Sequence, residues 1–198
     1  MRWPEPSDLT RPMPRCYRRG SAEFIAEFIK GSRTMKLPEA AQENLAFLLA
    51  ELDSQLASML AYFKAPSTAA ARKVILRAGY AHNLWSRVQA ACRAAGARGK
   101  PSQSRRLQLQ NVDTIARNLD QLSRLARLAL VHAEDVERVK LLRPSAYGTV
   151  LSHVAASLQE VLPALTASDS KRAIEIGQTK TEIDGFYDRM FRTYTRDM

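Results

Sequence analysis

Apolar residues recur every three or four positions along most of the chain, which is the spacing of one buried face of an amphipathic α-helix. No stretch shows the strict alternation with a period of two that a half-buried β-strand would require. The clearest helical run comprises Leu45, Leu48, Leu49, Leu52, Leu56, Met59, Leu60 and Phe63. The pattern therefore predicts an all-α protein, built as an antiparallel bundle of long helices.

Segments rich in proline, glycine and serine divide this pattern into five long helices. The segment KAPSTA ends the first helix and offers a serine or threonine as the N-cap of the second, and GARGKPSQS separates the second from the third. The expected helices run from Leu37 to Phe63, from about Pro66 to Ala95, from about Ser104 to Val139, from about Ala146 onward, and from about Asp169 to Arg196.

The first two helices resemble the last two when the sequence is shifted by 102 residues, which indicates an internal repeat. Under this shift Leu48 falls on Val150, Leu52 on Val154, Leu56 on Leu158, Val74 on Ile176 and Trp85 on Tyr187. The third helix has no copy. We therefore expect an irregular lead-in at residues 1–20, a short helix (residues 21–30) with a three-helix unit within 21–142, and a partial second unit at 143–198.

Positive charge is concentrated in one part of the chain, whose formal net charge is +10. Residues 64–127 hold 13 basic and 2 acidic residues, a local charge of 13 − 2 = +11. Such an excess favours an acidic partner, which could be a protein surface, a nucleic acid or, as peripheral contact, an anionic membrane. The candidate partner-binding residues are Arg72, Lys73, Arg77, Arg98, Lys100, Arg105 and Arg106.

Two stretches resemble helices of the PhoU family, bacterial regulators of phosphate uptake and phosphate-starvation signalling. Asp169–Tyr194 (DSKRAIEIGQTKTEIDGFYDRMFRTY) is similar to the second-helix pattern of that family, and Leu107–Ala126 (LQLQNVDTIARNLDQLSRLA) to its third helix. The resemblance implies tandem three-helix bundles and a cytoplasmic adaptor that contacts a phosphate transporter subunit or a sensor kinase. It also implies that iron or zinc could bind at acidic E/D-x-x-x-D motifs, as in many members.

The motif positions of the first unit depart from the family pattern. Asp120 takes the place of the family's glutamate, but Arg124 takes the place of its aspartate, and a guanidinium cannot ligate a cation. Tyr80 and His82 stand where the second unit has Glu182 and Asp184. The second unit retains Glu182, Asp184 and Asp188. We therefore expect no essential metal and no cofactor, with residual metal binding as the disfavoured alternative.

Asp113, Arg117, Asp120 and Arg124 follow one another at steps of four, three and four, so they share one helix face. Each acid precedes its base by four residues, the favourable orientation for an intrahelical ion pair. An exposed pair of this kind stabilises a helix by about 0.3–0.5 kcal/mol. The stripe is thus expected to form ordinary salt bridges where the family has metal ligands.

No Gly-rich phosphate loop, nucleophile elbow or catalytic triad pattern occurs, and the three histidines fall on three different predicted helices. The only two cysteines, Cys16 and Cys92, are far apart in sequence, so nothing indicates a disulfide framework and we expect a reducing compartment. These features favour a non-catalytic cytoplasmic adaptor without a transmembrane segment, and a basic helical nucleic-acid-binding module is the alternative. The apolar stripe of the fourth helix is expected to need a further wall, supplied by Ser21–Lys30 or by a second copy in a homodimer.

Overall fold

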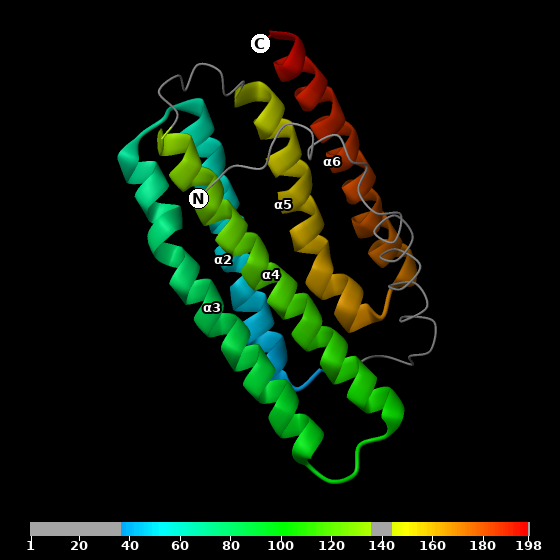
Figure 1. The fold of residues 1–198 in the computed structure, drawn as a ribbon. Coiled ribbons are helices and arrows are strands. Elements are labelled where there is room, and N and C mark those ends of the chain that lie inside the picture. Colours follow the sequence, from blue (N-terminus) through cyan, green and yellow to red (C-terminus); the bar gives the residue numbers. More distant parts are fainter. Residues whose placement is uncertain (1–36, 136–143, 198) are drawn as a thin grey trace, which may run out of the picture.

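The structure is a computed structural model that describes residues 37–135 and 144–197. The described residues form five long helices joined by short connections and contain no β-strand, so the predicted all-α class and the long-helix bundle are confirmed. The lead-in, the short helix expected at 21–30 and residues 136–143 lie outside the described part. Labelled as in Figure 1, the helices are α2 (Glu39–Lys64), α3 (Thr68–Ala97), α4 (Gln103–Asp135), α5 (Pro144–Ala167) and α6 (Ser170–Asp197).

The chain reverses where the sequence supplies caps. Ser67 is the N-cap of α3, as expected, because its Oγ accepts a hydrogen bond from the Ala70 amide at 3.2 Å. Gly99 (φ 73°) follows α3 in the left-handed region that glycine tolerates. Ser168 (φ 53°) follows α5 in the same region, and Asp169 then caps α6 by accepting from the Arg172 amide at 3.1 Å. These caps keep successive helices antiparallel.

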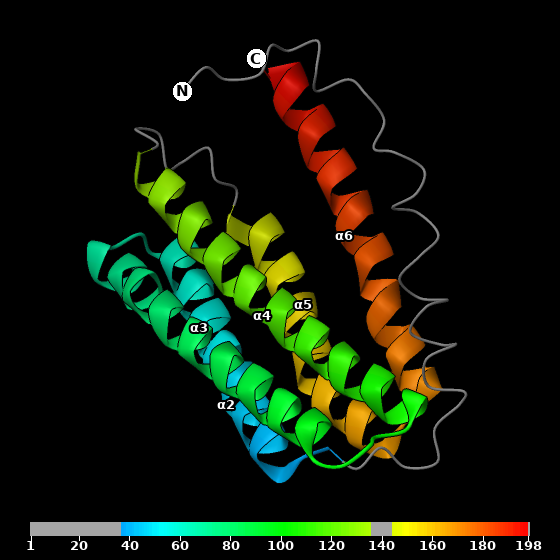
Figure 2. The ribbon, with the colours of Figure 1, turned by 60° about the horizontal axis from the view of Figure 1, so that its bottom comes forward.

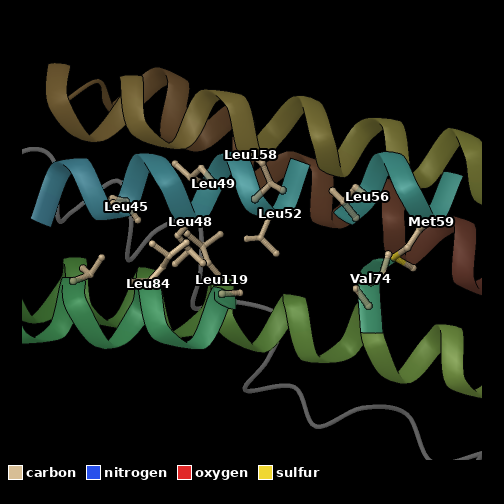
Figure 3. Close-up of a cluster of buried hydrophobic side chains, with 14 of the residues drawn as sticks. Leu45, Leu48, Leu49, Leu52, Leu56, Met59, Val74, Leu84, Leu119 and Leu158 are labelled. Atoms are coloured by element: carbon tan, nitrogen blue, oxygen red, sulfur yellow. The ribbon is translucent and has the colours of Figure 1, made fainter. Parts of the chain in front are cut away.

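Helices α2, α3 and α4 close into a three-helix bundle around one apolar core (Figure 1). The α2 stripe predicted from the sequence is buried except for Leu60, which is half-buried. Figure 3 shows this stripe facing Val74 and Leu84 of α3 and Leu119 of α4. The core therefore forms where the helical period places it.

Helix α5 packs on α2, and α6 packs on α5 (Figure 1). Leu158 and Leu165 of α5 are buried in the same cluster as the core of the three-helix bundle. Helix α2 thus covers part of the α5 stripe, and its remaining residues are half-buried: Val150, Leu151, Val154, Val161 and Leu162. A further wall from a second copy stays a prediction, and Ser21–Lys30 lies outside the described residues.

Helix α6 leaves the bundle toward its C-terminal end, as Figure 2 shows. Trp85 of α3 is half-buried, whereas Tyr187, its counterpart under the 102-residue shift, is 65% exposed. The two helix pairs thus differ in their surroundings at this position. Among the described residues, no helix has an apolar stretch sufficient to cross a membrane.

Candidate functional site

The acidic and basic stripe of α4 lies along the seam between α3 and α4 and forms the two ion pairs predicted for it. Arg117 Nη2 donates to Asp113 Oδ2 at 3.2 Å, and Arg124 Nε donates to Asp120 Oδ2 at 3.0 Å. Gln89 of α3 adds a longer hydrogen bond, from Nε2 to Asp113 Oδ1 at 3.4 Å. The stripe therefore connects the two helices as well as successive turns of α4.

Asp120 is not the surface residue that its intrahelical pair suggested. Its side chain is 4% exposed, whereas Arg124 is 57% exposed, so a guanidinium from the surface covers a buried carboxylate. His82 of α3 lies on the same pair, with Nδ1 at 3.4 Å from Asp120 Oδ2 and 2.9 Å from Arg124 Nη2. Arginine can only donate, so Nδ1 of His82 accepts where it bonds Arg124, whereas a hydrogen bond to Asp120 Oδ2 requires a proton on Nδ1. A single tautomer of His82 therefore forms one of these two hydrogen bonds at a time.

Two buried polar atoms at this cluster have no hydrogen-bond partner within the described chain: Asp120 Oδ1 and Trp85 Nε1. The rings of Trp85 and His82 are 5.0 Å apart, so the cluster is partly walled by an aromatic side chain. An unsatisfied buried acceptor costs stability, and a single water that bridges a donor and an acceptor is the usual remedy. The cluster is thus a small group of partly buried polar side chains in which Arg124 contacts both Asp120 and His82.

The donor set of this cluster does not suit a cation. A hard or borderline ion needs at least two deprotonated oxygens or an imidazole with free approach, and the guanidinium of Arg124 occupies both Asp120 Oδ2 and His82 Nδ1. Nowhere in residues 37–135 and 144–197 do three His, Cys, Asp or Glu side chains gather closely enough to hold a metal ion. The structure thus brings His82 and Asp120 together around Arg124, whereas Tyr80, the other motif position of α3, is exposed away from this cluster.

We predict that protein purified without chelator contains iron and zinc far below one equivalent, because the described part of the chain offers no open donor set to either ion. Elemental analysis by mass spectrometry measures this directly. Stoichiometric metal that disappears in Asp120→Asn would contradict the assignment of the cluster as an ion pair.

The acidic motif positions of α6 are placed elsewhere. Glu182 pairs with His153 of α5, with Oε2 at 2.7 Å from Nδ1, and Asp184 pairs with Lys180 within α6. Asp188 is exposed. Helix α6 lies beyond α5 from α3 (Figure 1), so these acids do not converge with Asp120.

An open groove of about 300 Å³ runs between α5 and α6, and it was not predicted. Arg172 donates from Nε to Glu160 Oε2 at 3.0 Å, and the hydroxyls of Ser157 and Thr179 are 2.7 Å apart. Most of the charged groups that line it are paired with each other. We therefore interpret the groove as a polar contact between α5 and α6, and not as a ligand site.

The predicted basic residues do not form one surface. Arg72 and Lys73 lie at the start of α3, and Arg98 and Lys100 follow its end, so about 26 residues of helix, or roughly 39 Å, separate the two groups. Arg77 is tied to α2: its Nη2 and Nε donate to Glu51 Oε2 at 2.5 and 3.1 Å, and its Nη1 donates to Ser54 at 2.9 Å. Arg77 is therefore held by α2 and is not a free side chain, although it is 47% exposed.

A buried polar chain that the sequence reading missed begins at this ion pair. Glu51, 3% exposed, accepts from Gln55 at 3.0 Å, and Gln55 accepts from Ser123 of α4 at 2.8 Å. Glu51 and Gln55 each follow a core leucine by three positions, and this spacing could have predicted that both side chains face the core. The chain links all three helices of the bundle.

Four basic side chains gather around the turn between α3 and α4: Arg93, Arg98, Lys100 and Arg106, here called the tip cluster. All four are exposed, and none forms an ion pair or hydrogen bond with another described residue. Arg105 beside them is half-buried and donates to Gln108 at 3.4 Å. The tip cluster is therefore a group of exposed, unpaired cationic side chains at one end of the bundle.

Cys92 lies beneath this cluster, buried between α3 and α4. Burial raises the pKa of its thiol from the ordinary 9.0 to about 11, with a further contribution from the charge of Asp113, while Arg105 lowers it. The reactive thiolate is consequently scarce near neutral pH.

We predict that Cys92, measured in a Cys16→Ser background, reacts with iodoacetamide far more slowly at pH 8.5 in the folded protein than after unfolding in urea. The thiolate fraction should keep rising between pH 9 and 11, because the folded-state pKa lies at the upper end of this range. Equal rates in the folded and unfolded protein would contradict the burial of this thiol.

The seam is thus an internally paired polar contact, and the tip cluster is an unpaired cationic surface. A surface of this kind attracts negatively charged partners and sets association rates more than affinities. No family model, curated protein or solved structure matches this chain.

Proposed function

We propose that this protein is a non-catalytic, PhoU-like regulatory adaptor that docks through its tip cluster on an acidic cytoplasmic protein surface. The observation that carries the proposal is the charge distribution: residues 65–112 contain nine basic residues and no acidic one. Four of those nine, the tip cluster, are exposed at one end of the bundle without a partner among the described residues. The docking surface is therefore small, positively charged throughout, and formed by the ends of α3 and α4 and the turn between them.

The link to phosphate rests on the resemblance of Leu107–Ala126 and Asp169–Tyr194 to PhoU helices. It makes a phosphate transporter subunit or a sensor kinase of phosphate signalling the partner to test first. The three long helices that close around one core are compatible with this proposal. A nucleic acid is the competing partner, because phosphates also neutralise clustered arginine and lysine.

We predict that Arg98→Glu/Lys100→Glu slows association with that transporter subunit or sensor kinase by about tenfold and flattens the salt dependence, because long-range attraction is lost. Arg72→Glu/Lys73→Glu changes the net charge equally at the other end of α3 and should have less than about a twofold effect. Biolayer interferometry of the purified proteins across a salt series measures both.

The same series is run with a random-sequence DNA duplex. Strong binding to DNA, weakened steeply by salt and by the tip substitution, would replace the adaptor proposal with the nucleic-acid alternative. Equal effects of the two charge reversals would show that net charge, and not the tip cluster, determines association.

A further inference from the structure

Three large apolar side chains are exposed on neighbouring sides of α2 and α3: Phe47 at 59%, Leu76 at 79% and Tyr80 at 49%. The ion pair between Arg77 and Glu51 fixes how the two antiparallel helices stand relative to each other. Phe47 lies one turn before Glu51 and Tyr80 nearly one turn after Arg77, so both lie on the same side of that pair. Together with the exposed Ala50, these residues are called here the α2–α3 face.

The two helices that carry this face have opposite charge. Helix α2 holds Glu39, Glu43, Glu51 and Asp53 against Lys64, a net charge of 1 − 4 = −3. Helix α3 holds five basic residues and no acidic residue, a net charge of +5, although Arg77 is paired with Glu51 and Arg93 belongs to the tip cluster. The exposed Glu39 and Glu43 make the α2 edge of the α2–α3 face acidic. The exposed Lys73 and Arg87 make its α3 edge basic.

Glu43 and Arg87 stand at nearly the same level on these two edges. Glu43 precedes Glu51 by eight residues and Arg87 follows Arg77 by ten, which corresponds to rises of about 12 and 15 Å in the same direction. Both side chains are exposed, and no ion pair joins either to a described residue. Two opposite charges are thus available at one height on the same face.

We propose that the α2–α3 face pairs with the same face of a second copy of this chain. A two-fold axis that runs along the seam between α2 and α3 places α2 of each copy against α3 of the other. The acidic edge of each copy then contacts the basic edge of the other. The contact between Glu43 and Arg87 forms two times, once in each direction, as an isologous interface requires. The apolar side chains of both copies form the centre, with the charges around them.

A second copy suits this face better than the other classes of occupant. A purely acidic protein surface or an anionic membrane would be repelled by Glu39 and Glu43, which lie on the same face as the basic edge. The face is about 39 Å long and about 20 Å wide, so each copy would bury up to about 800 Å², the size of a standard specific interface. The tip cluster lies on the α3–α4 side, so the dimer leaves it free and the inference does not depend on the proposed partner.

Sedimentation velocity over a concentration series tests the inference first. We expect a reversible wild-type dimer and a monomeric Leu76→Glu variant. Since Leu76 is 79% exposed, the two should have the same melting temperature at concentrations at which the wild type is monomeric. The matched control is Leu125→Glu on α4, which is 61% exposed on another face and should leave the dimer intact. A wild-type protein that stays monomeric at its highest soluble concentration, or a dimer that survives Leu76→Glu, would overturn the inference.

Charge reversal then tests the pairing itself. Glu43→Arg and Arg87→Glu should each weaken the dimer by about tenfold or more, because each places two like charges in contact twice. The double variant Glu43→Arg/Arg87→Glu restores opposite charges at both contacts and should recover most of the affinity. A double variant as weak as either single variant would exclude this arrangement of α2 against α3.

Discussion

Arg77→Met should destabilise the protein by about 2–3 kcal/mol, because it leaves the buried carboxylate of Glu51 without its counter-ion. The side chain of Glu51 is 2% exposed, and after the substitution only the amide of Gln55 would remain bonded to it. The guanidinium itself is 47% exposed, so water can enter when it is removed, and this keeps the expected cost at the lower end for a buried ion pair. Urea unfolding followed by circular dichroism measures the free energy of unfolding.

The matched control for this prediction is Arg72→Met, which lies on the same helix, is exposed and makes no ion pair with the described residues. It should change stability by less than about 0.5 kcal/mol. The double variant Glu51→Met/Arg77→Met removes both charges and should recover much of the loss. If Arg77→Met and Arg72→Met had the same stability, the ion pair with Glu51 would not stabilise the fold, and Arg77 would be a surface residue as the sequence suggested.

Leu158→Ala should destabilise the protein by about 2–4 kcal/mol, because this leucine is 6% exposed and lies among core residues of α2. Unfolding should remain a single cooperative transition, since the cavity would open in the core that α5 shares with the three-helix bundle. The control Leu128→Ala removes the same atoms from a side chain of α4 that is 49% exposed and should have a much smaller effect. An early separate transition, confined to α5 and α6, would show that these helices fold as an independent unit.

The helices and the main core could be predicted because they depend on local properties of the sequence. The three-four spacing from Leu45 to Phe63 fixes which side of α2 is apolar, and the segment KAPSTA fixes where α2 ends. The ion pairs of Asp113 with Arg117 and of Asp120 with Arg124 could be predicted for the same reason, since each joins residues four apart on one helix.

The placement of polar residues between helices could not be predicted in this way. The burial of Asp120 depends on α3, which packs over it and brings His82 and Trp85 to it. Arg77 resembles its basic neighbours in sequence, yet it alone of the predicted face meets a glutamate of α2. Which polar faces meet depends on how the helices are rotated against one another, and the helical period gives no information about that.

Site-specific photo-crosslinking in living cells tests the central claim, that the tip cluster is the docking site of an adaptor, most directly. A photo-reactive residue is placed at position 100, in the tip cluster, and in a separate protein at position 72, at the other end of α3. We expect position 100 to crosslink to a phosphate transporter subunit or a phosphate-signalling sensor kinase, whereas position 72 should not. Crosslinks from position 100 to nucleic acid, or equal yields of the same products at both positions, would contradict it.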